Sequence, residues 1–168
     1  MDRHTTLTDL ARPFPPAQLN WKPQMIAKDG SHALAVAYVD ARDVAERLDE
    51  VVGPLHWAVD HKAVGGQTLT GIGIRDSESG DWVWKWDTGL VGRSGDEALS
   101  VKGSLSDGLK RAAVLWGVGR YLYRLPKSWV AYDSQKRRLT EIPALPRWAI
   151  PDERRRTSEP ADRAGASA

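Results

Sequence analysis

The chain contains no cysteine among its 168 residues. This absence excludes a disulfide framework, a thiolate zinc site and a cysteine nucleophile, and it suits a reducing compartment. No apolar run approaches the ~20 residues that a membrane span needs, and the first residues lack the apolar core of a secretory signal. The sequence therefore predicts a cytoplasmic protein without a membrane partner.

The sequence also lacks the common motifs of nucleotide-driven and hydrolytic enzymes. It contains no G-x-x-x-x-G-K-[ST] phosphate loop and no G-x-S-x-G elbow. His56 and His61 are the only close histidine pair, and their spacing puts them on opposite faces of a strand, which disfavours a metal site. These observations predict a protein that is not an enzyme and carries no cofactor.

Net charge is only +2, but it is distributed unevenly. Residues 1–95 hold 10 Lys and Arg against 13 Asp and Glu, whereas residues 96–168 hold 14 against 9. This asymmetry indicates either a phosphate-facing surface in the second part or an acidic–basic contact between subunits.

Tryptophan is over-represented, because eight of the 13 aromatic residues are Trp and only one is Phe. Trp82, Trp84 and Trp86 alternate along a predicted strand and therefore share one face. Such a stripe is more often core or subunit interface, but exposed aromatics beside positive charge also suit stacking of unpaired bases. The sequence leaves both interpretations open.

Local patterns predict a mixed α+β fold. A short helix over residues 5–12, capped by Thr5 or Thr6, precedes a proline-rich extended segment. Residues 33–39 read as a strand and residues 41–52 as an amphipathic helix, with Asp40 and Asp43 as an imperfect capping box. An antiparallel meander follows, with strands over 57–64, 67–75 and 81–88 and a turn at Gly65-Gly66.

The second part of the chain contains the longest helical pattern, which Ser94 or Asp96 can cap and Pro126 ends. The predicted buried stripe of this helix consists of Leu105, Leu109, Ala112, Trp116 and Tyr123. A last hairpin is predicted over 129–140. We expect one domain over residues 1–150 and a disordered polar tail over 151–168.

The long helical pattern is almost entirely basic on one side. If it runs unbroken, a helix advancing about 100° per residue puts Lys102, Lys110, Arg120 and Arg124 within about 80° of one another. An ordinary solvated helix mixes both signs of charge, so a positive band favours contacts with phosphates, although an ordinary basic face or salt bridges between subunits would produce it too.

Residues 102–126, K-G-S-L-S-D-G-L-K-R-A-A-V-L-W-G-V-G-R-Y-L-Y-R-L-P, resemble the helix signature of the bacterial DdrA (DNA damage response A) proteins of the Rad-fifty-two superfamily. Further agreement lies in Trp21-Lys-Pro23, in Tyr38–Val44 and in Leu125–Trp129. The resemblance covers roughly residues 12–150, and its most specific segment is Ser106–Ala112.

The resemblance implies a β-β-β-α core, a three-stranded antiparallel meander packed on a long helix, with a preceding strand–helix unit and assembly into a homo-oligomeric ring. It also implies a nucleoid-associated protein that binds single-stranded DNA, protects 3′ ends and promotes single-strand annealing in DNA repair and recombination, without ATP. Recombination or repair proteins are expected partners.

The same resemblance assigns DNA-binding residues. The adjacent basic pair of the family corresponds to Lys110 and Arg111, a hydroxyl position to Ser106 and an earlier basic position to Lys102. Two departures stand out, because a further arginine of the family falls on Val114 and another on Asp43. The expected substitutes are Arg42 and Arg120, both of which lie close in sequence.

Two alternatives remain. One is a metal-dependent DNA-processing enzyme that uses Asp60, Glu97 or Asp107. The other is a structural assembly protein whose basic band contacts the acidic part of its neighbour without binding DNA.

Overall fold

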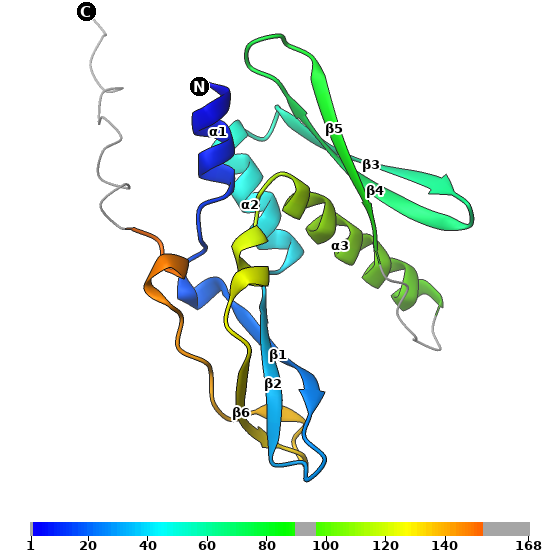
Figure 1. The fold of residues 1–168 in the computed structure, drawn as a ribbon. Helices are drawn as coiled ribbons and strands as arrows, with labels where there is room; N and C mark the ends of the chain where they lie inside the picture. The colour runs from blue at the N-terminus through cyan, green and yellow to red at the C-terminus, as the bar shows by residue number, and fades with distance from the viewer. Residues whose placement is uncertain (1, 90–96, 153–168) are drawn as a thin grey trace, which may run out of the picture.

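The computed structural model describes residues 2–89 and 97–152, and it confirms the mixed α+β class. Its strands form two antiparallel sheets, one in the order β3-β4-β5 and one in the order β1-β2-β6-β7. The first is called the meander sheet here and the second the hairpin sheet. Figure 1 shows α3 beside the meander sheet and the hairpin sheet at the opposite end of the molecule.

The elements are α1 (Arg3–Leu10), β1 (Asn20–Ile26), β2 (His32–Tyr38), α2 (Ala41–Val52), β3 (Trp57–Val64), β4 (Gln67–Arg75), β5 (Trp82–Thr88), α3 (Glu97–Leu115), β6 (Ser128–Asp133) and β7 (Arg138–Leu139), with short 3-10 turns at Pro16–Gln18, Arg120–Arg124 and Arg147–Ala149.

The meander sheet lies where the sequence predicted its three strands. Gly65 and Gly66 form the β3–β4 turn with φ of 57° and 77°, the left-handed conformations that a two-residue hairpin turn requires. On one face of β4, Thr70, Ile72 and Ile74 are buried, and α3 packs against β4 and β5. The alternation of β4 therefore gives the sheet one face toward the core.

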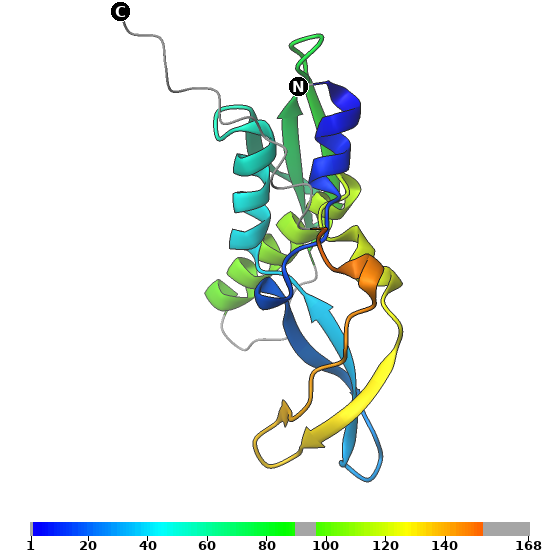
Figure 2. The same ribbon diagram turned by 90° about the vertical axis from the view of Figure 1, so that its left-hand side faces the viewer.

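The hairpin sheet was not predicted as a sheet. A strand over residues 33–39 and a hairpin over 129–140 were predicted, whereas β1 was predicted only in part, as the end of a proline-rich extended segment. β2 lies between β1 and β6, and the pairing of Ala33 with Val130 joins two distant parts of the chain. The register of β1 shifts between Pro23 and Met25, where a proline has no N–H to donate to a neighbouring strand. Figure 2 shows this sheet projecting below the helices.

The predicted helix over 41–52 matches α2 at both ends. Asp40 is the N-cap, and its backbone N–H donates to the Asp43 carboxylate at 2.9 Å, as in a capping box. The helix stops at Gly53, which has a φ of 86°. For α1 the prediction was displaced: the helix begins at Arg3, because Asp2 accepts the Thr5 N–H at 3.0 Å and replaces the predicted threonine cap.

The predicted length of the basic helix was wrong. α3 ends at Leu115, and the predicted capping residues Ser94 and Asp96 lie outside the described residues. Gly117 and Gly119 adopt φ of 99° and 67°, which ends the right-handed helix and turns the chain toward β6. Tyr123, predicted on the buried stripe, is consequently 74% exposed.

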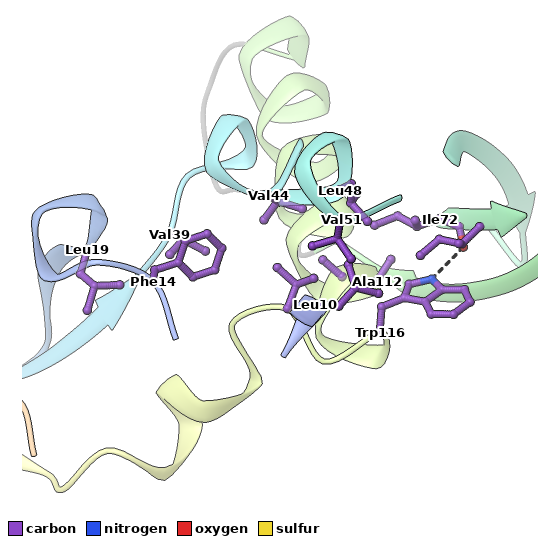
Figure 3. Packing of buried hydrophobic residues seen from close by; sticks show 13 residues of the cluster. Leu10, Phe14, Leu19, Val39, Val44, Leu48, Val51, Ile72, Ala112 and Trp116 are labelled. Atoms are coloured by element: carbon purple, nitrogen blue, oxygen red, sulfur yellow. Dashed lines mark hydrogen bonds between the residues drawn. The ribbon is translucent and has the colours of Figure 1, made fainter. Parts of the chain in front are cut away.

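The core joins the helices to the meander sheet. Leu10, Leu48, Ile72 and Ala112 are fully buried, and Figure 3 shows Trp116 beside them with its indole N–H donating to the Ile72 carbonyl at 3.0 Å. This hydrogen bond holds the C-terminal end of α3 against β4.

A buried arginine ties α1 to α2. Arg47 donates to the Arg12 carbonyl at 2.6 Å, and its guanidinium lies 4.2 Å from the centre of the Phe14 ring. Burial lowers the pKa of Arg47, and the neighbouring charge of Arg12 lowers it further. Because the guanidinium stacks on an aromatic ring and donates to backbone carbonyls, its polar groups are satisfied inside the fold.

Candidate nucleic-acid interface

α3 reaches its position because one residue lacks a side chain. A Cβ built on Gly108 would lie 2.5 Å from Thr70 Oγ1 and 2.9 Å from Thr70 Cβ. Only glycine allows the helix to approach β4 this closely. This contact fixes the rotation of α3 and therefore the directions of the residues that follow, Lys110 and Arg111.

The predicted basic pair is divided between two environments. Successive residues of a helix point about 100° apart. Arg111 points to the meander sheet and forms an ion pair with Asp87 of β5, with Nη2 3.3 Å from Oδ1. Lys110 points instead to the hairpin sheet, where its Nζ lies 5.6 Å from the centre of the Tyr38 ring.

A second lysine converges on the same ring. Nζ of Lys22, from β1, lies 5.2 Å from the centre of the Tyr38 ring. Both distances fall within the ~6 Å range of cation–π contacts, worth about 0.5–1 kcal/mol when exposed. Lys22, Tyr38 and Lys110 are called the basic cluster here. It brings two positive charges together from elements far apart in sequence.

Lys22 and Tyr38 were not predicted as site residues. Both lay within segments that carried the family resemblance, so a signal was present. Their juxtaposition depends on the β1–β2 register, which pairs Lys22 with Val36, two residues before Tyr38. Alternation along β2 then puts Val36 and Tyr38 on the same face as Lys22.

Lys102 and Ser106 continue from the basic cluster along α3. They precede Lys110 by eight and four residues and lie within about 80° of it around the helix axis, over about 12 Å. Lys102 is exposed and Ser106 is half-buried. The structure therefore gives α3 one polar side that begins at Lys102 and reaches the basic cluster.

Arg42 and Arg120 occupy different surroundings. Arg42 is exposed in the first turn of α2, four residues after Tyr38. Arg120 lies beyond the end of α3 and donates to the Val114 and Leu115 carbonyls at 2.9 and 2.8 Å. Its guanidinium therefore caps α3, and the predicted continuous band through Arg120 and Arg124 is interrupted by the end of the helix.

Lys85 of β5 caps the same helix end. Its Nζ donates to the Leu115 carbonyl at 3.0 Å and lies 4.1 Å from the centre of the Trp116 ring. Burial lowers the pKa of Lys85, and the charge of Arg120 lowers it further. Lys85 and Arg120 thus stabilise the C-terminal end of α3.

The tryptophan stripe lies outside the core cluster. In the β4–β5 register Trp84 and Trp86 face Gly73 and Gly71, on the side of the meander sheet opposite Ile72. Trp82 is 44% exposed and the other two indoles are half-buried. The core interpretation of this stripe is therefore wrong, and the interface and base-stacking interpretations remain.

Within residues 2–89 and 97–152, no three His, Asp or Glu side chains gather in a group that could hold a metal ion. None of the described helices is long and apolar enough to cross a membrane. Asp60 is exposed on β3, away from α3. The side chain of Glu97, another candidate of the enzyme alternative, lies outside the described part of the chain.

Comparison with known proteins finds the same family that residues 102–126 resemble. Residues 77–140 match the model of the Rad52/22 family double-strand break repair proteins. Over 146 residues, 87% of this chain, the sequence is 44% identical to the single-stranded DNA-binding protein DdrA of Deinococcus deserti, of which it covers 70%. It is 38% identical over the same length to the single-stranded DNA-binding protein DdrA of Deinococcus radiodurans, of which it covers 68%.

Proposed function

The chain belongs to the DdrA family of single-stranded DNA-binding proteins, and from that membership we propose that it binds single-stranded DNA and promotes strand annealing in DNA repair and recombination. The observation that carries the proposal is the basic cluster, in which Lys110 of α3 and Lys22 of β1 converge on one ring, together with Lys102 earlier on the same helix. The proposed binding track runs from Lys102 past Ser106 to Lys110 and Lys22.

The chemistry of this track suits annealing. Positive side chains neutralise phosphates and leave base edges free to sample a complementary strand. Lysines on flexible stems make such contacts without reading sequence. Arg111 contributes less, because the Asp87 carboxylate already neutralises part of its charge. Arg42 is proposed as an additional contact from α2, and Arg120 as a helix cap rather than a DNA contact.

The proposed DNA binding also involves assembly of several copies of the chain. We propose that the meander sheet and α3 form the β-β-β-α core of a homo-oligomeric ring, in which each subunit adds its own short track. A few phosphate contacts bind weakly alone, but linked copies raise the effective concentration of each further contact. In this form the protein would act at the nucleoid without ATP, protect 3′ ends and assist recombination or repair proteins.

The direct test is a binding titration with a labelled single-stranded oligonucleotide at ~150 mM salt. The Lys110→Ala/Arg111→Ala double variant is expected to lose about tenfold or more in affinity, with a shallower salt dependence, because phosphate contacts are removed. Lys22→Ala is expected to weaken binding in the same way. Lys28→Ala, which removes an exposed lysine beyond the far end of β1, serves as the matched control and should bind normally.

Asp87→Asn tests the assigned environment of Arg111 in the opposite direction. Removing the carboxylate releases the guanidinium from its ion pair, so affinity for single-stranded DNA should rise severalfold.

Unchanged affinity in the Lys110→Ala/Arg111→Ala variant would show that the site is assigned wrongly. If the unaltered protein does not bind DNA and Lys110→Glu dissociates the oligomer, the structural assembly alternative holds instead.

A further inference from the structure

The outer face of the meander sheet carries an array of flat indole rings. A Cβ built on Gly71 would lie 2.5, 2.6 and 2.7 Å from three consecutive atoms of the Trp86 six-membered ring. Built on Gly73, it would lie 2.6, 2.7 and 2.8 Å from three consecutive atoms of the Trp84 ring. Three nearly equal distances mean that each ring faces its glycine, so the opposite ring face points away from the sheet.

The three rings form a continuous row. The centres of Trp82 and Trp84 are 6.1 Å apart with planes 29° apart, and those of Trp84 and Trp86 are 5.4 Å and 23° apart. Bases stacked in duplex DNA are spaced at ~3.4 Å. Successive bases can therefore sit on successive indoles only when the strand is stretched and unpaired, which selects single-stranded over double-stranded DNA.

Positive charge accompanies the row. Nζ of Lys62 lies 4.0 Å from the centre of the Trp86 ring, and Arg75 faces Trp82 in the register. Asp60 is the one carboxylate among the β3, β4 and β5 residues that share this face. A phosphate would draw the Lys62 ammonium from the indole and uncover the ring for a base. Aromatic rings on a sheet surface beside basic side chains are a known arrangement for stacking unpaired bases.

The row also lies close to the contact between the meander sheet and α3, the helix that carries the proposed binding track. β5 is an edge strand of the meander sheet, and its consecutive residues Trp86 and Asp87 point to opposite faces. Asp87 pairs with Arg111 on the helix side, so the edge strand β5 separates the row from the meander-facing side of α3. We infer that the row Trp82-Trp84-Trp86 is a second contact surface for single-stranded DNA, on which unpaired bases stack. This inference rests on the proposed DNA binding and adds base contacts to it.

The test compares two strands of equal length, one of oligothymidylate and one with the same sugar–phosphate backbone and abasic positions. The unaltered protein should bind the base-containing strand roughly tenfold more tightly, because stacking is lost without bases. The Trp84→Thr/Trp86→Thr variant keeps strand-forming residues and should bind both strands with the affinity that the unaltered protein has for the abasic one. Trp148→Thr, which alters an exposed tryptophan elsewhere, should retain the preference.

A measurement on the unaltered protein covers the case in which this variant does not fold. Light-induced crosslinking to an oligonucleotide that contains 5-bromouracil should attach it to a peptide spanning residues 82–88. Equal binding of both strands by the unaltered protein, no crosslink in that peptide, or an unchanged preference in the folded variant would each overturn the inference. A lower mass of the folded variant in solution would also overturn the inference. It would mean that the tryptophans hold the oligomer together, so that a second copy of the chain covers the row.

Failure of this inference is distinguishable from failure of the proposed function. If the abasic strand binds and the Lys110→Ala/Arg111→Ala variant loses that binding, the proposed function stands whatever the tryptophans do. If neither strand binds, the proposed function fails first.

Discussion

The meander sheet and the hairpin sheet are both antiparallel, but they are stabilised differently. The meander sheet has α3 packed on β4 and β5, and it contributes the buried residues Ile72 and Ile74 to the core. The main contacts of the hairpin sheet are between its own strands, and Met25 and Trp129 are 58% and 50% exposed on either side of Leu34. One sheet depends on a helix, whereas the other depends on strand pairing.

This difference bears on the proposed function. The basic cluster lies at the junction of the two regions, with Lys110 on the helix that covers the meander sheet and Lys22 in the hairpin sheet. Because one side is supported by a packed helix and the other by a less covered sheet, we expect the spacing between the two lysines to vary more than distances within the core. Regions with few buried apolar contacts open locally at lower free energy than a packed core does.

The largest expected effect comes from equivalent truncations in the two sheets. Ile72→Ala should lower the free energy of unfolding by about 4 kcal/mol, because Ile72 is fully buried and the cavity is surrounded by core. Leu34→Ala should cost about 2 kcal/mol, since its exposed neighbours can relax into the space. Urea denaturation measures both, and equal costs would remove the distinction between the sheets.

The second effect concerns the contact that joins α3 to the meander sheet. Gly108→Val should cost about 3 kcal/mol, because its side chain overlaps Thr70 and forces the helix away from β4. Gly103→Ala is the matched control on the same helix: no atom lies within 4 Å of its added Cβ, so it should raise stability by up to about 1 kcal/mol. Thermal unfolding of both variants tests this pair, and destabilisation by both would contradict the close approach.

The smallest effect concerns the attachment of α1 to the β4–β5 turn. Hydrogen bonding from Arg3, followed by that from Ser79, holds the pKa of Asp76 below its ordinary value of 3.8. The unfolded chain therefore binds this proton at a higher pH, so the pair stabilises the fold above pH 4 and loses that contribution as the pH falls below it.

Arg3→Gln isolates this contribution. The difference in Tm between the unaltered protein and the variant should be small at pH 6, because the Arg3 side chain is 56% exposed, and should vanish as Asp76 is protonated. A difference that stays unchanged between pH 6 and pH 2.5 would mean that Arg3 stabilises the fold through contacts that do not depend on carboxylate charge, whereas its ion pairs with Asp76 and Glu78 both weaken as the pH falls.

Local sequence signals predicted much of the fold. The α2 boundaries followed from Asp40 and Gly53, and the meander strands followed from alternation and the Gly65-Gly66 turn. The pairing of β2 with β6 was not predictable, because no local signal specifies a partner so far along the chain. The end of α3 was missed since its apolar spacing continued to Tyr123, whereas the left-handed conformations of Gly117 and Gly119 ended the helix.

Part of the candidate site was likewise predictable from local sequence, and part required the tertiary structure. Lys102, Ser106 and Lys110 could be placed on one side of a helix from their spacing alone. Recognising Lys22 required the register of the hairpin sheet, and pairing Arg111 with Asp87 required knowing that β5 packs on α3. For the tryptophans, alternation predicted the shared face, but only the cross-strand glycines determine that the rings lie flat.

The position of β2 between β1 and β6 also has a consequence for folding during synthesis. A ribosome that adds about 5–20 residues per second completes β6 roughly 5–20 s after it completes β2. During this interval the nascent β2 has one partner strand and one unpaired edge, which another emerging copy of the chain can bind. Neighbouring ribosomes on one messenger RNA would bring such copies together, so β6 competes with them to close the sheet.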